Sequence, residues 1–181
     1  MWATGSFDGT TVPPMRLTSF TDYALRVLIF LASRPEEKAT IAGVATAFGI
    51  SENHLVKVVH FLGREGLVAT VRGKGGGLYL GRPAETIRIG EVVRACEGQA
   101  VAAECFSPGA PGCAIVRVCR LQGVLREAVM AFEAVLDRYT LADVAANRAE
   151  LQGVLFPATV SMARLPRAPR ARAGKAEAAA R

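Results

Sequence analysis

The sequence predicts a mainly α-helical fold with one small β-hairpin. Three observations lead to this expectation. Apolar residues recur at helical spacing in successive segments between residues 19 and 64. Two short apolar runs then flank a loop of glycines and cations at 72–77, which is the pattern of a hairpin. A long apolar stripe at helical spacing follows over residues 120–139.

Length and charge divide the 181 residues into a folded unit with a leader and a tail. The leader, 1–14, shows little periodicity and ends directly before Met15, so we expect it to be disordered or to precede the natural start. The tail, 157–181, carries six Lys and Arg against one acidic residue, and we expect it to be disordered. The formal net charge is +6, and basic segments of this kind are candidate surfaces for an anionic polymer.

Nothing in the sequence indicates export or a membrane. No run of 18 apolar residues occurs, and the leader lacks the basic and hydrophobic regions of a signal peptide. We therefore expect a cytoplasmic protein. Reducing conditions in the cytoplasm keep the four cysteines as thiols or metal ligands rather than as structural disulfides.

Three helices are expected before the hairpin. The first begins after Thr18 or Ser19 and ends at Ser33. The second is capped by Thr40 and ends at Gly49, which supplies the positive φ of a helix C-terminus, and the third starts after it. The positions expected to be buried are Leu25, Leu28, Ile29 and Ala32 in the first helix, Ile41, Val44, Ala45 and Phe48 in the second, and Leu55, Val58, Val59 and Leu62 in the third.

The third helix also carries a polar stripe on another face. Asn53, Lys57, His60 and Arg64 recur at i, i+4, i+7 and i+11. A short helix, a turn at Gly49 and a longer helix with a polar outer face form the helix-turn-helix arrangement, whose second helix presents side chains to base edges. A three-helix protein with a solvated face fits the same pattern, so this motif alone leaves DNA binding open.

A wing is expected directly after the third helix. Residues 67–71 and 78–80 form two short strands around the loop, and its glycines allow close approach to a phosphate backbone. Arg72 and Lys74 supply charge for contacts that position the protein without reading sequence. A flexible hairpin without DNA contact is the alternative. A nucleotide-binding P-loop is excluded because Lys74 is followed by Gly75 and not by Ser or Thr.

With a wing, residues 15–95 are expected to form a winged helix-turn-helix DNA-binding domain. Asn53 and His54, near the start of the reading helix, are the candidates for base edges, whereas Lys57 and Arg72 are expected to contact the backbone. The full set of residues expected at the DNA interface is Ser51, Asn53, His54, Lys57, His60, Arg72, Lys74, Gly75 and Tyr79.

The cysteines define a candidate metal site. Cys96 falls on the apolar stripe of a helix expected over 87–97, so we expect it in the core. Cys105, Cys113 and Cys119 lie in a Pro- and Gly-rich loop, 96–119, that cannot hold itself together by packing. Their gaps are longer than those of zinc sites, and three thiolates with a weaker fourth ligand suit an iron-sulfur cluster. Free thiols on a loop are the alternative.

Residues 120–156 are expected to form a long helix, 120–138, and a C-terminal helical arm. The apolar stripe of the long helix is larger than packing against the short segments before it requires, so it needs a further partner. One possible partner is a second copy of the chain; residues 120–138 would then be the dimerisation helix of a twofold dimer on a pseudo-palindromic operator. The other possible partner is the first helix of the same chain. The basic tail would add salt-dependent attraction to DNA.

Several blocks together resemble one known family. The blocks resemble, in the same order, those of the winged-helix iron-sulfur transcriptional regulators of the NsrR and IscR type. They are residues 15–26, 53–59, 71–77 with 80–83, and 87–93. They look most like the nitric-oxide-sensing repressors of that family. The similarity spans about residues 15–156, and several blocks in one order are far more specific than any single block.

The resemblance implies a homodimer with one cluster per subunit, a 4Fe-4S rather than a 2Fe-2S cluster. Cys105, Cys113 and Cys119 match the family's cysteine ligands, and Asp22 stands where some members supply an oxygen ligand from the other subunit. The resemblance further implies that nitric oxide attacks the cluster, that the protein then releases DNA, and that nitric-oxide-detoxification genes are derepressed. Without the resemblance, Asp22 is explained as a carboxylate in the first turn of a helix, where the helix dipole favours a negative charge.

Two departures from the family pattern stand out. The gap between Cys105 and Cys113 is longer than is usual in the family, which puts the geometry of the loop in doubt. Gln122 stands where IscR-like members place a histidine ligand, which argues against a site of that type.

Two other classes of function compete with this one. A cysteine thiol-disulfide regulator without a cluster would be colourless, with DNA binding that depends on oxidants. An enzyme would need a paired general acid and base or a nucleotide fingerprint, and the sequence has neither. We therefore expect a regulator with no catalytic residues.

Overall fold

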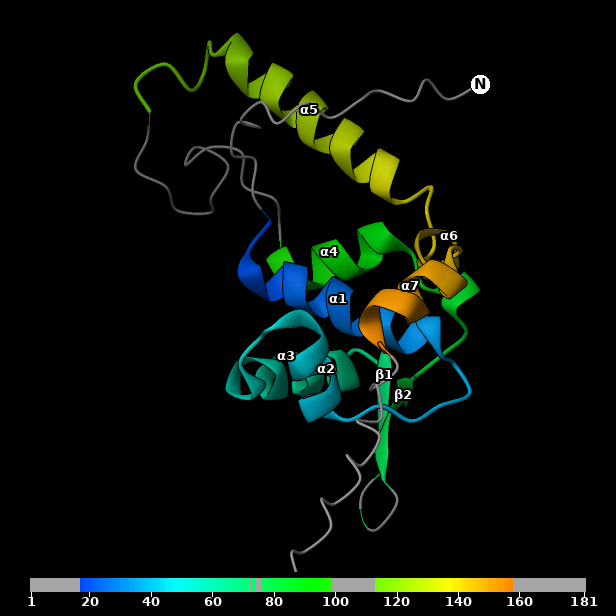
Figure 1. Ribbon diagram of the computed structural model, residues 1–181. Coiled ribbons are helices and arrows are strands. Elements are labelled where there is room, and N and C mark those ends of the chain that lie inside the picture. Colours follow the sequence, from blue (N-terminus) through cyan, green and yellow to red (C-terminus); the bar gives the residue numbers. More distant parts are fainter. Residues whose placement is uncertain (1–16, 72, 74–75, 99–112, 158–181) are drawn as a thin grey trace, which may run out of the picture.

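The structure, a computed structural model, describes residues 17–71, 73, 76–98 and 113–157 (Figure 1). Its order is three helices, a two-stranded hairpin, a short 3-10 helix and four further helices. The hairpin and α3 lie at one end of the molecule, and α5 lies at the other. The bounds are α1 Ser19–Ser33, α2 Ile41–Phe48, α3 Glu52–Arg64, β1 Val68–Val71, β2 Gly77–Leu80, η1 Ala84–Thr86, α4 Ile89–Glu97, α5 Arg120–Leu136, α6 Leu141–Val144 and α7 Arg148–Leu155. These elements confirm the mainly α fold with a hairpin.

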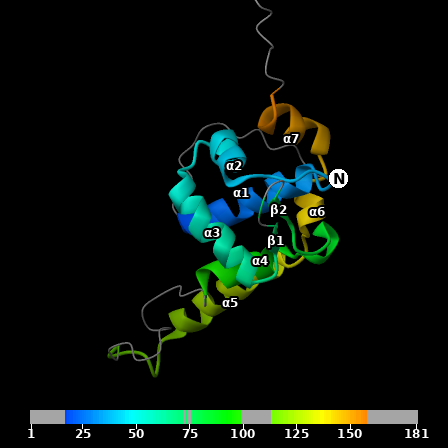
Figure 2. The ribbon, with the colours of Figure 1, turned by 90° about the horizontal axis from the view of Figure 1, so that it is seen from below.

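Helix α1 is the centre of the fold. Figure 2 shows it surrounded by α2, α3, α4, α6 and α7. Thr18 is its N-cap as expected, and the Thr18 hydroxyl accepts from the Thr21 amide at 3.3 Å. The expected stripe was partly wrong, because Leu25 and Ile29 are only partly buried. Neighbours cover α1 on several sides, so its buried set is wider and includes Ala24, Val27, Leu28, Phe30, Leu31 and Ala32.

Helices α2 and α3 form the expected helix-turn-helix. Gly49 ends α2 with a φ of 64°, and its N–H donates to the carbonyl of Ala45. Ile41 and Phe48 are only partly buried, whereas Val44 and Ala45 are buried. In α3 the apolar stripe is confirmed, because its four members, Leu55, Val58, Val59 and Leu62, are all buried.

The hairpin is attached to the body along β2. Strands β1 and β2 are antiparallel, with Val68 opposite Leu80 and Val71 opposite Gly77. Leu78 is buried, and it exchanges backbone hydrogen bonds with Ala39 at 2.8 and 3.1 Å. A Cβ at Gly77 would come within 2.9 Å of the Ala39 carbonyl oxygen, so glycine permits this approach.

Helix α5 is attached to the body through α4. None of its residues is buried within the single chain. At its end the Arg94 guanidinium pairs with both Asp137 carboxylate oxygens at 2.9 Å, and Arg88 donates to the Asp137 carbonyl at 2.6 Å. The alternative in which this helix packs along α1 is therefore wrong, because α4 lies between them (Figure 1).

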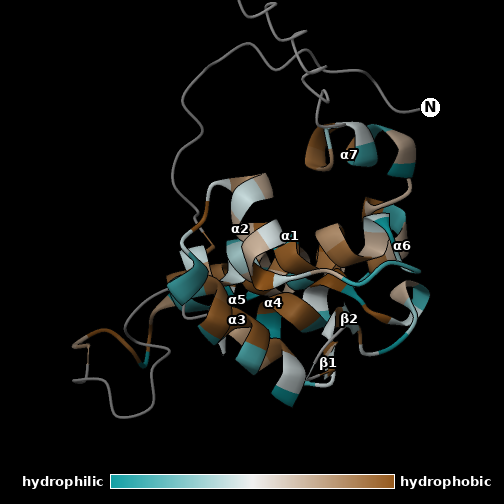
Figure 3. Cartoon of the chain, turned by 60° about the horizontal axis from the view of Figure 1, so that its bottom comes forward, coloured by the Kyte–Doolittle hydropathy of each residue, from teal (hydrophilic) through white to brown (hydrophobic). Residues whose placement is uncertain are grey.

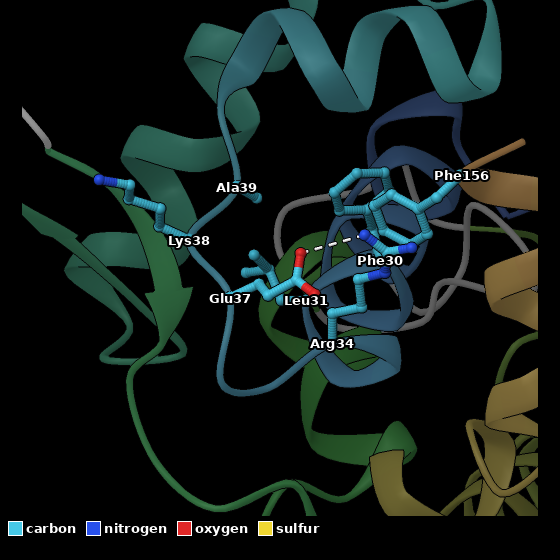
Figure 4. A pocket seen from close by; sticks show the side chains of 7 residues that line it. All are labelled: Phe30, Leu31, Arg34, Glu37, Lys38, Ala39 and Phe156. Atoms are coloured by element: carbon cyan, nitrogen blue, oxygen red, sulfur yellow. Dashed lines mark hydrogen bonds and ion pairs between the residues drawn. The ribbon is translucent and has the colours of Figure 1, made fainter. Parts of the chain in front are cut away.

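Helix α7 closes the fold onto the end of α1. The Gln152 amide donates to the Ser33 carbonyl at 2.6 Å, which satisfies a carbonyl that the helix leaves open. The Phe156 ring lies 4.7 Å from that of Phe30, and the Arg34 guanidinium lies 3.8 Å above it. These side chains line a cavity of about 20 Å³ (Figure 4).

Several expectations lie outside the described residues. They concern the leader, the tail beyond Pro157, and Arg72, Lys74, Gly75 and Cys105. Among the described residues, none of the helices has the length and apolar character needed to cross a membrane.

Candidate DNA-binding surface and cluster ligands

The polar face of α3 is open to solvent. Ser51, Asn53, His54, Lys57 and His60 are all exposed, as expected for residues that meet DNA. In Figure 3, hydrophobic and hydrophilic residues alternate along α3. Because α3 and the hairpin lie at the same end of the molecule (Figure 1), one duplex can reach both.

Aromatic contacts fix α3 on the first turns of α1. The Phe20 and Phe61 rings meet edge to face, with centroids 5.2 Å apart. The Tyr23 and His54 rings stack with centroids 6.3 Å apart and planes 27° apart. One face of the His54 ring is therefore against Tyr23 while the residue stays exposed, which presents the imidazole from a supported position. Sequence patterns do not point to Tyr23 or Phe20, because neither contact has a local signal.

On the described part of the wing, Tyr79 is partly buried on β2, opposite Ala69 of β1. Arg72, Lys74 and Gly75 fall between β1 and β2 in the sequence and lie outside the described residues.

Two of the three candidate cluster cysteines lie on the segment that leads into α5. Cys113 is exposed, and Cys119 is the partly exposed N-cap of α5. Between them the chain turns, with the Val116 amide donating to the Cys113 carbonyl at 3.0 Å. In the part of the chain that the structure describes, no group of three His, Cys, Asp or Glu side chains gathers around a metal site.

These two cysteines fit a soft metal centre by their chemistry. Thiolates are the ligands that iron-sulfur clusters require. Cys119 stands at the N-terminus of α5. The intervening segment is apolar and exposed at Ile115, Val116 and Val118, so a further surface must cover it to exclude water from a cluster.

Asp22 lies in the first turn of α1, in the body of the molecule. The segment 113–119 instead leads into α5, and α1 and the start of α5 stand apart in Figures 1 and 2. Both Asp22 oxygens are engaged by Arg26, at 3.0 Å from Nε and 2.9 Å from the terminal nitrogen. Its side chain is nevertheless 44% exposed. A single chain therefore does not bring Asp22 to Cys113 and Cys119.

A polar cluster that the sequence did not reveal joins α4 to α1. A Glu97 carboxylate oxygen accepts from the Thr18 amide at 2.7 Å, from the Thr18 hydroxyl at 3.0 Å and from the Thr21 hydroxyl. Burial raises the pKa of Glu97, but the hydrogen bonds from Thr21 and Thr18 outweigh it and hold the pKa below its ordinary value. Glu97 thus ties the last residue of α4, directly before the cysteine loop, to the start of α1.

Cys96 packs against the core, but it is only half-buried, so the expectation of a core residue is met in part. Burial raises the pKa of the Cys96 thiol to about 11, and the Glu97 charge adds to the shift. Deprotonation of this thiol is therefore less favourable than that of an exposed cysteine.

Comparisons with known proteins bear on both candidate sites. The model of the Rrf2 family, described as an iron-dependent transcriptional regulator, matches residues 17–147. The chain belongs to the Rrf2 family. This family consists of transcriptional regulators, so the expectation that the chain is not an enzyme is confirmed.

Among curated relatives, the HTH-type transcriptional regulator NsrR of Bacillus subtilis is 49% identical over 142 residues, which cover 78% of this chain and 97% of the relative. That of Geobacillus kaustophilus is 50% identical over 143 residues, with the same coverage. The expected resemblance is thereby confirmed, and the chain is a DNA-binding transcriptional regulator.

Solved structures support the winged-helix fold. The oxidised form of Staphylococcus aureus CymR matches with a TM-score of 0.57 and 27% identity, covering 72% of this chain and 96% of that one. T. potens IscR matches in fold with a TM-score of 0.60 and 24% identity, covering 76% of this chain and 91% of that one.

Proposed function

We propose that this regulator is a nitric-oxide-responsive repressor that contains an iron-sulfur cluster. As a homodimer it would occupy a pseudo-palindromic operator and release it when nitric oxide reacts with the cluster, which derepresses genes of nitric oxide detoxification. The observation that carries the proposal is the 49% identity to a regulator named NsrR over 97% of its length, in a chain that carries Cys105, Cys113 and Cys119.

Three cysteines and one carboxylate are the proposed cluster ligands. Cys105, Cys113 and Cys119 would each supply a thiolate, and Asp22 of the second subunit would supply a weaker oxygen ligand. A 4Fe-4S cluster suits this set, and when bound it supplies the iron that reacts with nitric oxide. Arg26 contacts both Asp22 oxygens, and because each oxygen can accept a second partner, Asp22 could bind iron while Arg26 holds it in place.

Helix α5 is the proposed dimerisation surface. It has no buried residue in one chain, and its exposed apolar side chains include Leu121, Val124, Met130 and Val135. Single exposed apolar side chains are normal on a protein surface, but α5 exposes several of them together. A twofold pairing of two α5 helices would cover them. The same pairing would cover the apolar segment between Cys113 and Cys119.

The proposed DNA-binding domain, residues 15–95, would place α3 in the major groove. Asn53 and His54 would meet base edges, and Lys57 with the wing cations Arg72 and Lys74 would meet phosphates. The remaining proposed contacts come from Ser51, His60, Gly75 and Tyr79.

The route between the two sites would run through α1. Glu97 fixes the start of the cysteine loop to Thr18 and Thr21, and α1 carries α3 through the Phe20–Phe61 contact. A tenfold change in DNA affinity needs only about 1.4 kcal/mol, so a small displacement of this connection is sufficient. The coupling is reciprocal, so DNA would favour the cluster-bound state in turn.

The test is to purify the full chain without air, measure its iron, sulfide and absorption spectrum, and titrate it onto promoter DNA at fixed salt before and after nitric oxide. We expect a coloured, iron-containing protein that loses at least tenfold in affinity when nitric oxide is added. Cys105→Ala, Cys113→Ala and Cys119→Ala should each lose iron. Cys96→Ala is the matched control and should retain it.

Three results would decide against parts of the proposal. A colourless protein that binds its operator only under one redox condition would establish the thiol-disulfide alternative. Unchanged affinity after nitric oxide would remove the sensing function. Full iron content and an unchanged spectrum in Asp22→Ala would remove Asp22 from the ligand set.

A further inference from the structure

One apolar side chain interrupts the polar face of α3. Val56 is 50% exposed, and the sequence analysis gave it no role. On a helix its neighbours are the residues three and four positions away, which are Asn53 on one side and His60 on the other. Both are exposed and belong to the proposed DNA contacts. Val56 therefore lies within the surface that would enter the major groove.

The fold itself gives no reason for valine at this position. The core contacts of α3 are made by Leu55, Val58, Val59 and Leu62, each at most 5% exposed. A β-branched residue is also a weaker helix former than alanine, lysine or glutamate. Single exposed apolar residues are common on protein surfaces, so the position of Val56 between two side chains proposed to contact DNA is what makes it informative.

The major groove offers one apolar group at its base edges, the C5-methyl of thymine. The other edges present hydrogen-bond donors and acceptors that an isopropyl group cannot satisfy and would desolvate. In a helix valine is held almost entirely in one χ1 rotamer, so its methyl groups are already ordered before DNA binds. A methyl-to-methyl contact would then cost little conformational entropy.

We propose that Val56 is a specificity-determining residue that contacts the C5-methyl group of one thymine in each operator half-site. The inference rests on the proposed function, because it needs α3 in the major groove. It adds a prediction about the operator that the polar candidates do not make. One conserved position of each half-site is a thymine, and its methyl group rather than its hydrogen-bonding edge is what the protein detects.

The experiment removes that methyl group alone. The operator is first located by footprinting the full-length, cluster-containing protein on promoter DNA. Symmetric pairs of thymines, one in each half-site, are then replaced by deoxyuridine, and dissociation constants are measured by fluorescence anisotropy at fixed salt. Burial of one methyl-sized group corresponds to about a fourfold change in affinity, so a symmetric pair should weaken binding by about tenfold or somewhat more.

The wild-type protein should show this loss at one thymine pair, whereas Val56→Ala should bind the thymine and deoxyuridine operators equally at that pair. Two variants serve as controls. Lys57→Ala should weaken all duplexes alike and keep the thymine dependence. Val154→Ala, which removes a valine that is 78% exposed on α7, should behave as wild type.

The outcomes separate the inference from the proposed function. Operator binding with no dependence on any thymine methyl, or a dependence that persists in Val56→Ala, would overturn the inference and leave the repressor function standing. Failure of the cluster-containing wild type to bind promoter DNA at all would overturn both.

Discussion

Replacing Gly90 with alanine should loosen α5 from α4. A Cβ at residue 90 would overlap the Asp137 carboxylate, coming within 2.8 Å of its Cγ, and would lie 3.1 Å from a terminal nitrogen of Arg94. Asp137 cannot simply turn away, because its two oxygens are held by Arg94 and its carbonyl by Arg88. The added methyl group therefore displaces the contact that fixes the end of α5.

The size of the effect follows from three contributions to the free energy of unfolding. Alanine in place of helical glycine favours the fold by up to about 1 kcal/mol. Loss of the Arg94–Asp137 pair, which is about 40% exposed on each side, costs about 0.2–1 kcal/mol. Steric overlap in a packed contact costs about 1–3 kcal/mol. We expect Gly90→Ala to lower the free energy of unfolding by about 1 kcal/mol.

Gly153→Ala is the matched control, because the same change in α7 would meet nothing within 4 Å. It should raise the free energy of unfolding by about 0.5–1 kcal/mol. Both variants are compared with wild type by urea unfolding at one protein concentration, since association contributes to stability. A Gly90→Ala protein as stable as Gly153→Ala would refute the reasoning. In an Asp137→Ala background the penalty of Gly90→Ala should disappear.

Three further changes test other contacts. Glu97→Gln should lower the thermal midpoint at pH 7 by about 2–4 °C, since its hydrogen bonds contribute about 1 kcal/mol. Because folding lowers the pKa of Glu97, the stability that its hydrogen bonds contribute is complete above the ordinary pKa of 4.5 and is lost as the pH falls through the folded pKa. The thermal midpoints of wild type and variant should therefore converge in acid. A difference that stays constant across pH would show that the hydrogen bonds to the ionised carboxylate are not its cause. Thr140→Ala removes the capping box with Asp143 and should cost about 1 kcal/mol in urea unfolding, and no loss would show that the box is dispensable. Leu121→Glu, at a position 60% exposed on α5, should convert the proposed dimer to monomers in sedimentation velocity with unchanged circular dichroism, whereas an intact dimer would place the interface elsewhere.

Local signals made most of the fold predictable. Thr18, Thr40 and Gly49 mark helix ends through bonds to residues within four positions, and the structure has those ends where they were expected. Periodicity identified the buried stripe of α3 because that helix has one covered side. It misplaced Leu25 and Ile29 because α1 is covered on several sides, where a single stripe no longer describes burial.

The candidate sites depended more on distant contacts. The exposed face of α3 followed from spacing alone. The stacking of Tyr23 on His54 and the triple hydrogen bond of Glu97 join residues at least 31 positions apart, and no local pattern encodes such pairs. Helical spacing put Cys96 on the buried stripe of α4, but spacing does not show that its burial is only partial.

The two ends of α1 depend on chain that is synthesised much later. Glu97 binds its first turn from 79 residues downstream of Thr18, and Gln152 binds the Ser33 carbonyl from 119 residues downstream. During synthesis the helix at the centre of the fold therefore emerges from the ribosome first, and it acquires these two bonds only after α4 and then α7 have emerged. We expect the C-terminal end of α1 to stay frayed in nascent chains until α7 has emerged, so truncation before Arg148 should leave the amides of the last turn of α1 open to hydrogen exchange.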